Sequence, residues 1–313
     1  TPLLLSILLF LLGLVILVVG SNLFVDTALR LAKRFRVPEI IIGATMVSFG
    51  TTLPEVMFSS TAAFHGHVDM ALGNALGSVI CNAAFVAGIM QTIRPSPLDR
   101  RSLASGTINF FIFLTIYFIL AMAFGGIPRL CGILMVILCV VYTIRTLKGA
   151  GADISAEPAK GSTLADICLL ILEGCFLYAG AHLLVTYGPV IARYIGVPER
   201  VISLTLVALG TSLPELMTAI NALVKGHGAL SIGNIVGANI LNLLLVGGLA
   251  SAITPIVFPS TILSIELPLI AFTMGVLCIP AIIRGKMMRW QGLVLIGTYI
   301  AVSYTHLRAH ETL

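Results

Sequence analysis

Apolar residues run in ten long segments along the chain, and short polar connections separate them. The segments cover approximately residues 3–25, 39–63, 70–92, 104–124, 127–146, 163–187, 200–223, 229–252, 261–283 and 287–303. A transmembrane helix needs about 20 consecutive, predominantly apolar residues, and most of these segments have that length. The pattern predicts an all-α membrane protein with ten transmembrane helices.

The longest connection, at residues 147–162, divides the chain into two units of five helices. It combines glycine, proline and mixed charges, which is typical of a loop. We expect a first five-helix repeat at residues 1–146, a cytoplasmic linker at 147–162 and a second, inverted five-helix repeat at 163–303. Residues 304–313 turn abruptly polar, and we interpret them as an atypical tail that truncation or vector-derived sequence has left.

Composition excludes a soluble domain, and charge predicts the orientation. The chain is 58% hydrophobic and 10% charged, with a mean hydropathy of +1.08. If both termini lie outside, 14 Lys and Arg residues fall on the cytoplasmic side and 4 outside, which is a strong positive-inside bias. The net charge of +5 therefore reflects membrane topology, and we expect no nucleic-acid partner. We predict a multi-pass protein of a prokaryotic cytoplasmic (inner) membrane.

The two halves of the chain repeat one another at an offset of 160 residues. This offset superposes Gly43–Met57 on Ser203–Met217 with 8 of 15 positions identical, and Ala71–Asn82 on Ser231–Asn242 with 5 of 12 identical. Because five is an odd number of spans, the second half must enter the membrane from the opposite side. Inverted repeats of this kind place binding sites between discontinuous helices at the bilayer midplane.

The most similar stretch places a carboxylate inside the second helix of each repeat. It is Gly50–Glu55, which returns as Gly210–Glu215. Glycine followed by proline interrupts a helix and frees carbonyl groups, so we expect helices 2 and 7 to be discontinuous. Thr51 or Thr52 is expected to cap the half-helix that follows. A charge in the bilayer centre costs about 2.5–3.5 kcal/mol even on lenient scales, so these glutamates are expected to have a function.

Polar positions in spans 2, 3, 7 and 8 can complete a cation site around the two glutamates. Two carboxylates balance one Ca²⁺, which prefers six to eight oxygen ligands, whereas Mg²⁺ demands stricter geometry. Na⁺ can use the same oxygens singly. The alternative is that these side chains only join helices by hydrogen bonds. The positions are Ser48, Thr51, Thr52, Ser78, Asn82, Thr211, Ser212, Asn239 and Asn242, with the carbonyl groups of Ser48 and Ala208 as further ligands.

A few other residues lead to weaker expectations. Glycines spaced four apart in spans 3 and 8 predict close helix packing, and the role of the asparagine inside each pair is left open. Glu173, in span 6, either takes part in ion or proton access or faces a water-filled or protein-lined surface. The six cysteines lack paired spacing and predict no disulfide framework. The glycine pairs with their asparagines are Gly73, Asn74 and Gly77, and Gly233, Asn234 and Gly237.

These residues resemble the cation/calcium antiporter family, specifically its bacterial Na⁺/Ca²⁺ exchanger-like branch. The family's G-T-S-L-P-E and G-N-x-x-G-S-N signatures appear here as Gly50–Glu55 with Gly73–Asn82, and as Gly210–Glu215 with Gly233–Asn242. The resemblance covers all ten spans. It implies an inverted repeat around four central ion sites, electrogenic exchange of several Na⁺ for one Ca²⁺, and alternating access by spans 1 and 6 sliding over a rigid core.

The resemblance also implies roles for individual residues. By position, Thr51, Glu55, Thr211 and Glu215 resemble the Ca²⁺ ligands. Three departures concern the Na⁺ sites: threonine at 52 in place of the usual serine, alanine at 238 in place of the serine equivalent to Ser78, and asparagine at 242 where some relatives have aspartate. The positions that resemble the remaining ion-lining residues are Ser48, Thr52, Ser78, Asn82, Ala208, Ser212 and Asn242.

We therefore predict an Na⁺/Ca²⁺ antiporter that acts as a monomer, with Ca²⁺, Na⁺ and the lipid bilayer as partners and no cofactor. A H⁺/Ca²⁺ antiporter is the main alternative, because the same two glutamates can exchange protons. A passive cation channel is a further alternative, although an inverted repeat with an acidic centre favours alternating access. An enzyme is not expected, because no nucleophile–base pair or catalytic metal motif stands out.

Overall fold

The computed structural model describes residues 3–94, 99–149, 161–196 and 210–309 of the chain. Within these ranges the fold is helical apart from one short antiparallel pair, β1 (Gly126–Ile127) and β2 (Ile256–Val257). The first half contains α1 (Leu3–Phe35), α2 (Glu39–Ile42), η1 (Gly43–Val47), α3 (Ser48–Thr51), α4 (Leu53–Phe64), α5 (Val68–Ile80), η2 (Cys81–Val86), α6 (Ala87–Ile93), α7 (Arg100–Phe124) and α8 (Arg129–Gly149). The second half contains α9 (Thr163–Tyr194), α12 (Leu213–Val224), α13 (Gly228–Leu241), η4 (Asn242–Val246), α14 (Gly247–Ile253), η5 (Ile262–Glu266), α15 (Leu267–Arg284) and α16 (Arg289–Ala309).

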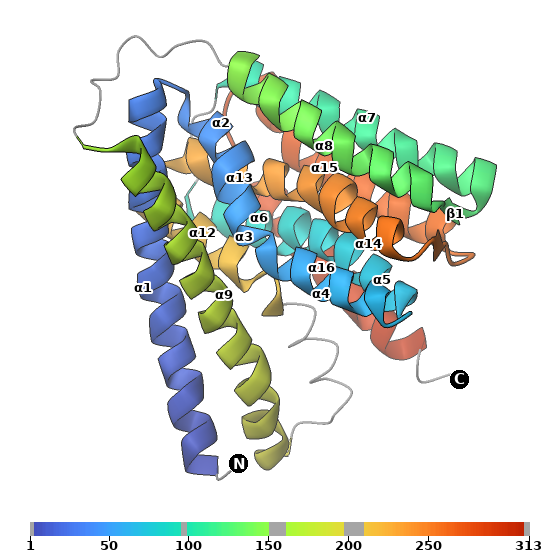
Figure 1. Cartoon of the computed structure of the whole chain (residues 1–313), viewed down its shortest axis with the longest axis horizontal. Helices are drawn as coiled ribbons and strands as arrows, with labels where there is room; N and C mark the ends of the chain where they lie inside the picture. Colours follow the sequence, from blue (N-terminus) through green and yellow to red (C-terminus); the bar gives the residue numbers. More distant parts are fainter. Residues whose placement is uncertain (1–2, 95–98, 150–160, 197–209, 310–313) are drawn as a thin grey trace.

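Two long helices, α1 and α9, lie side by side at one edge of the molecule, and the shorter helices form a bundle beside them (Figure 1). Glycines bring the two backbones together, since a Cβ added at Gly180 would lie 2.8 Å from the backbone nitrogen of Leu17. A separate apolar cluster, which includes Leu17, Phe24 and Leu177, fills the space between this pair and the bundle. The arrangement gives the molecule two packed parts.

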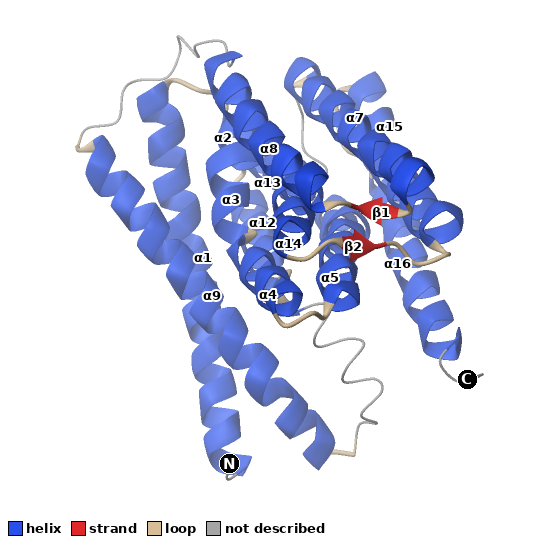
Figure 2. Ribbon diagram, turned by 45° about the vertical axis from the view of Figure 1, so that its right-hand side comes forward, coloured by secondary structure: helices blue, strands red, loops and turns tan. Residues whose placement is uncertain are grey.

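The span that runs through α13, η4 and α14 forms the centre of the bundle (Figure 2). In its most apolar window 83% of the residues are buried within the protein, against 22% for α1 and for α8. A helix that is apolar on all sides is typically buried among others. The central span is therefore enclosed by protein, whereas the outer helices expose apolar side chains over much of their length, as membrane helices do.

The described residues contain seven single helices that are long and apolar enough to cross a membrane, and the bent span from Glu39 to Phe64 makes an eighth. Residues 200–209 of the predicted seventh span, which covers 200–223, lie outside the described residues. The last helix, α16, is 21 residues long and continues to Ala309, past the predicted end of span 10 at residue 303. The count of ten spans remains a prediction.

The structure corrects the extent of the first span, which the apolar pattern ends at residue 25. Helix α1 continues to Phe35, because the charged residues of its last turns pair with other helices and do not enter a loop. Asp26 forms an ion pair with Lys225 at 2.6 Å, and Arg30 and Arg34 pair with Asp166 of α9 at 3.1 and 2.7 Å. The mean hydropathy falls where these charges begin, so the pattern alone underestimates the helix.

Several helices of the second half begin and end 160 residues after their counterparts in the first half. Helix α4 begins at Leu53 and ends at Phe64, and α12 begins at Leu213 and ends at Val224. Helices α6 and α14 repeat in the same register, as do the first residues of α1 and α9 and both ends of α8 and α16. The repeat found in the sequence is thus also a repeat of helix starts and ends.

Candidate cation site

The site lies where the second span of each repeat breaks. Helices α2 to α3 and helix α4 are bent by 46° around Thr52. Pro54 lies within the first turn of α4, and since proline has no N–H, the Gly50 carbonyl lacks its usual helical donor. In the second repeat α12 begins after Ser212 with Pro214 in the same place. The predicted discontinuity of helix 2 is therefore observed. Ala208, the candidate carbonyl ligand of the second repeat, lies outside the described residues.

The expected capping of α4 by Thr51 or Thr52 is wrong. Thr52 and Ser212 occupy the N-cap positions of α4 and α12, but neither side chain bonds to the helix that it precedes. Thr52 Oγ1 instead lies 3.5 Å from Glu215 Oε1, and Ser212 Oγ lies 3.4 Å from Glu55 Oε1. Each hydroxyl faces the glutamate of the other repeat, because the two helix breaks lie opposite one another.

The first threonine of each motif follows the same crossed pattern. Thr51 Oγ1 donates to Asn234 Oδ1 at 3.2 Å, and Thr211 Oγ1 donates to Asn74 Oδ1 at 3.3 Å. The Asn74 amide also donates to Ser59 Oγ at 2.9 Å and to the Glu55 carbonyl at 3.3 Å. The sequence left these two asparagines unassigned, although their identity at the 160-residue offset was a signal that could have found them.

The same threonines lie beside the carboxyl groups. Thr211 interacts with Glu55, and Thr51 interacts with Glu215. The carboxyl group of Glu55 in turn interacts electrostatically with that of Glu215. The four residues expected to bind Ca²⁺ therefore meet at one place, and the two repeats contribute to it equally.

Helices α5 and α13 supply the remaining polar groups unequally. Ser78 Oγ lies 3.4 Å from Glu55 Oε1, whereas Ala238 gives Glu215 no equivalent hydroxyl. Asn82 and Asn242 are fully buried, and none of their side-chain amide atoms has a hydrogen-bond partner in the described structure. Asn239 is directed elsewhere, since its amide contacts the sulfur of Met274 at 3.1 Å. Buried amides without partners are costly and therefore indicate a ligand or water.

Ser48 differs from the expectation that its carbonyl is open. That carbonyl accepts the Thr52 amide at 2.9 Å and lies 3.3 Å from Thr51 Oγ1, and the Ser48 hydroxyl donates to the Thr45 carbonyl at 3.0 Å. Helical bonding continues through α3 as far as Thr52, so the carbonyl that proline frees is that of Gly50. The prediction of an open Ser48 carbonyl is therefore wrong. The residue itself lies fully buried beside the helix break.

Neither glutamate has a basic partner among the described residues. Both are fully buried, and one carboxylate oxygen of each has no hydrogen-bond partner in this part of the chain. The ion pairs of the described residues all lie elsewhere, on Asp26, Asp166 and Glu39. A buried charge without a partner is strongly unfavourable. The arrangement therefore fits a divalent cation or two monovalent ones, held by carboxylate, hydroxyl and amide oxygens.

Glu173, His227 and His65 have their partners outside this site. Glu173 accepts a hydrogen bond from Thr27 of α1 at 3.0 Å, so it joins α1 to α9. His227 pairs with Glu39 at 2.9 Å, and His65 bonds to the Thr61 carbonyl. No cluster of three His, Cys, Asp or Glu side chains suited to a metal occurs among the described residues. The close packing predicted for the glycine pairs is confirmed at Gly233 and Gly237, where an added Cβ would lie 2.1 and 2.4 Å from backbone oxygens of α2 and η1. It is wrong at Gly73 and Gly77, where an added Cβ would have no neighbour within 4 Å among the described residues.

Comparison with known proteins gives consistent matches over nearly the whole chain. The family model described as sodium/calcium exchanger protein matches residues 5–148 and 166–307. Membrane protein MJ0091 of Methanocaldococcus jannaschii is 33% identical over 299 residues, which cover 93% of this chain and 94% of that protein. Sodium/calcium exchanger MaX1 of Methanosarcina acetivorans is 28% identical, covering 94% and 96%. A structure of the sodium-calcium exchanger NCX_Mj soaked with Na⁺ and Sr²⁺ matches with a TM-score of 0.84 and 30% identity, covering 96% and 98%.

Proposed function

Because the chain belongs to the sodium/calcium exchanger protein family, we propose that it exchanges Na⁺ for Ca²⁺ across the membrane by alternating access. The family consists of transporters, and the chain is a multi-pass membrane protein with the fold of NCX_Mj. Two of the proteins that it matches are named as sodium/calcium exchangers. The cargo ions are Na⁺ and Ca²⁺, and the protein is active as a monomer in the cytoplasmic membrane of a prokaryote.

Glu55, Glu215, Thr51 and Thr211 bind Ca²⁺ in this proposal. The observation that carries it is the pair of fully buried glutamates without a basic partner among the described residues. One Ca²⁺ neutralises both charges, and the crossed hydroxyls of Thr52 and Ser212 hold the two carboxylates toward one another. Since the ligands come from both repeats, a cation bound there joins the two halves of the protein.

Na⁺ competes for the same oxygens and for the flanking polar positions. Buried amides at Asn82 and Asn242 and the hydroxyl at Ser78 extend the site along α5 and α13. Ala238 removes one hydroxyl from the second repeat, so the Na⁺ site on that side has fewer ligands. Because Na⁺ and Ca²⁺ use the same carboxylate oxygens in this proposal, their occupancy is mutually exclusive, which couples the two fluxes. Ala208 and Ser212 complete the set of proposed ion-lining positions, whereas Ser48 lies buried beside the break with its carbonyl hydrogen-bonded.

A gradient experiment in proteoliposomes tests the exchange. Vesicles loaded with Na⁺ are diluted into Na⁺-free buffer, and ⁴⁵Ca²⁺ entry is followed, with an imposed pH gradient as the comparison. We expect Ca²⁺ uptake to follow the Na⁺ gradient and to stop when Na⁺ is equal on both sides. Uptake that follows only the pH gradient would assign the protein to proton exchange, and uptake without any counter-gradient would assign it to the channels.

A further inference from the structure

One face of α4 lines a cavity that reaches the cation site. The cavity has a volume of about 450 Å³, and its lining runs along α4 from Pro54 to His65, with α9 as the opposite wall. With a helical rise of 1.5 Å per residue, this face is about 16 Å long. Thr211 of the cation site lines the same cavity, whose other end lies at the turn after α4. The cation site is therefore open along α4 toward the side of His65.

The counterpart face of α12 is covered by α1. Met217 and Ala222 of this face pack in the apolar cluster that α1 and α9 share, and Thr218 is only 1% exposed. Met57, the counterpart of Met217 at the 160-residue offset, is 50% exposed. The same face of the broken span is thus open in one repeat and closed in the other.

Polar contacts fasten α1 to the end of α12. The Asn221 amide donates to Ser21 Oγ at 2.5 Å. Lys225 Nζ donates to the Asn22 carbonyl at 3.0 Å and forms an ion pair with Asp26 Oδ1 at 2.6 Å. These contacts lie beyond the buried face of α12, where a path from the cation site along this helix would have to leave the protein.

The equivalent positions on the other side are not fastened. Asn221 and Lys225 correspond to Thr61 and His65, and Ser21 and Asn22 correspond to Ala181 and His182. All four counterparts line the cavity along α4. In the described part of the chain, neither Thr61 nor His65 bonds to α9, and the His65 ring bonds to the Thr61 carbonyl of its own helix. The contacts that close one side therefore have no equivalent on the other.

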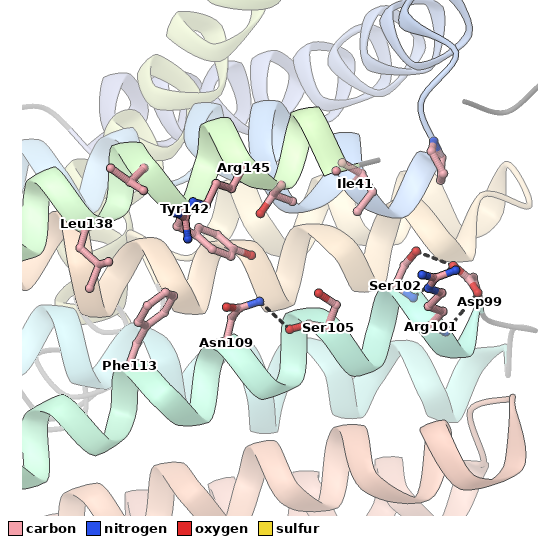
Figure 3. Close-up of a pocket in the computed structure, with 14 residues that line it drawn as sticks. Ile41, Asp99, Arg101, Ser102, Ser105, Asn109, Phe113, Leu138, Tyr142 and Arg145 are labelled. Atoms are coloured by element: carbon pink, nitrogen blue, oxygen red, sulfur yellow. Dashed lines mark hydrogen bonds between the residues drawn. The ribbon is translucent and has the colours of Figure 1, made fainter. Parts of the chain in front are cut away.

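Two further cavities do not provide a polar route to the cation site. The slot between α7 and α8, at the proposed cytoplasmic side, is lined by polar side chains such as Asn109 and Arg145 but by no residue of the cation site (Figure 3). The cavity between α3 and α9 borders Gly50, but side chains such as Phe49 and Ile171 make it mainly apolar. A cation is not stable in apolar surroundings. The route along α12, which α1 covers, therefore remains the counterpart of the open one.

We propose that Lys225, Asp26, Asn221 and Ser21 form an inner latch, which holds α1 on α12 and keeps the cation site closed toward the cytoplasm. The inference rests on the proposed exchange function and on the orientation that places the end of α12 inside. The Lys225 and Asp26 side chains are 26% and 47% exposed, so water screens the ion pair. A pair of this kind contributes modestly and can open in every transport cycle, whereas a deeply buried pair is costly to break.

Thiol labelling of a reporter on the covered face of α12 tests the latch. Thr218→Cys is placed in inside-out membrane vesicles with equal ion concentrations on both sides, and a membrane-impermeant methanethiosulfonate is added outside them. Intact-protein mass spectrometry follows the labelling, with the protein that lacks Thr218→Cys as background. We expect slow labelling of the reporter alone and labelling about two- to fivefold faster when Lys225→Gln or Asp26→Asn is added, the factor that a partly exposed ion pair supplies. No ion gradient is used, so failure of the exchange test would leave this result readable.

Matched variants separate the latch from a general loosening of α1. Arg30→Gln removes another cation of α1, which pairs with Asp166 of α9, and should label like the reporter alone. The charge swap Asp26→Lys/Lys225→Asp should return the labelling rate toward that of the reporter alone. Asn221→Ala, which keeps all charges, should also speed labelling.

Three results would overturn the latch: unchanged labelling in both charge variants, an equal rise in Arg30→Gln, or a swap that labels as fast as the single variants. Gel filtration of each variant in detergent establishes that it is folded.

Discussion

At the scale of single residues, the cation site depends on side chains that serve the opposite repeat. Thr52 reaches Glu215 and Ser212 reaches Glu55, so neither glutamate is held mainly by its own motif. A serine or threonine before a helix ordinarily caps it. Here the two hydroxyls lie 3.5 and 3.4 Å from carboxylates of the opposite repeat and do not bond to the helix that follows them.

Replacing either glutamate by glutamine tests the charge at the centre. In Glu55→Gln or Glu215→Gln one carboxylate becomes a neutral amide of the same shape, and the remaining charge no longer balances Ca²⁺. We expect Na⁺-driven ⁴⁵Ca²⁺ uptake to fall at least 100-fold, because even outer partners of metal ligands contribute 10- to 100-fold. Glu266→Gln, in the turn before α15, is the matched control and should keep uptake near the parent rate. Normal transport in either site variant would remove that glutamate from the site.

Asn74 offers a second test at this scale. Its side chain joins Thr211 to the backbone of Glu55, so it positions two expected ligands without carrying charge. Asn74→Ala should weaken Ca²⁺ binding about tenfold, measured by titration calorimetry of the purified protein, while the number of sites stays at its parent value. Asn22→Ala, on the exposed side of α1, is the control. An unchanged Ca²⁺ affinity in Asn74→Ala would limit this residue to packing.

At the scale of elements, α1 and α9 pack closely against each other along their length. Their backbones touch at Gly13 and Gly180, and a ladder of polar contacts continues the pairing toward Arg34. Asp166 receives two arginines of α1, and Thr27 links Arg30 to Glu173. The hydrogen bond from Thr27 places Glu173 between these two helices.

The glycine contact predicts the effect of a single methyl group. In Gly180→Ala the new Cβ would lie 2.8 Å from the Leu17 nitrogen and 2.9 Å from the Gly13 oxygen, so α1 and α9 must separate. Overpacking of this kind typically costs about 1–3 kcal/mol, and we expect a lower thermal unfolding midpoint in detergent together with slower transport. Gly297→Ala on α16 adds a methyl group with no neighbour within 4 Å and should be neutral or slightly stabilising. Equal midpoints in the two variants would contradict the close approach.

At the scale of the whole molecule, the repeat relates local geometry in the two halves. The turns after α4 and α12 each contain a glycine with positive φ, Gly66 at +80° and Gly226 at +88°. Both turns follow helices of twelve residues in the same register. An inverted repeat requires these two similar turns to lie on opposite sides of the membrane, although they are equivalent in conformation.

Thiol labelling of matched positions tests the inversion. Phe64 and Val224 are equivalent at the 160-residue offset and are 77% and 68% exposed, so a cysteine fits at either place. In intact spheroplasts a membrane-impermeant maleimide should label Phe64→Cys, and it should label Val224→Cys only after permeabilisation. The parent protein, with its six native cysteines, provides the background signal. Labelling of both variants from the outside would exclude an inverted arrangement.

Much of the architecture can be predicted from the chain alone. Apolar length predicts the membrane helices, and the 160-residue offset predicts which helix ends correspond, because both depend on local residue pattern. The extent of α1 could not be predicted in this way, since the charges at Asp26, Arg30 and Arg34 are accommodated by partners on distant helices. The capping of α4 was predicted wrongly for the same reason.

The sequence by itself determined that two acidic residues lie inside apolar helices, each at a glycine–proline break, and that the halves of the chain repeat. Covalent structure is sufficient for this, because proline lacks an N–H and a carboxylate is costly in hydrocarbon. Only the tertiary structure decided which groups surround each glutamate. Contacts between residues 137 to 183 positions apart in the chain place four polar side chains around the glutamates: Thr52, Ser212, Asn74 and Asn234. Such contacts arise from helix packing, which no local sequence pattern encodes.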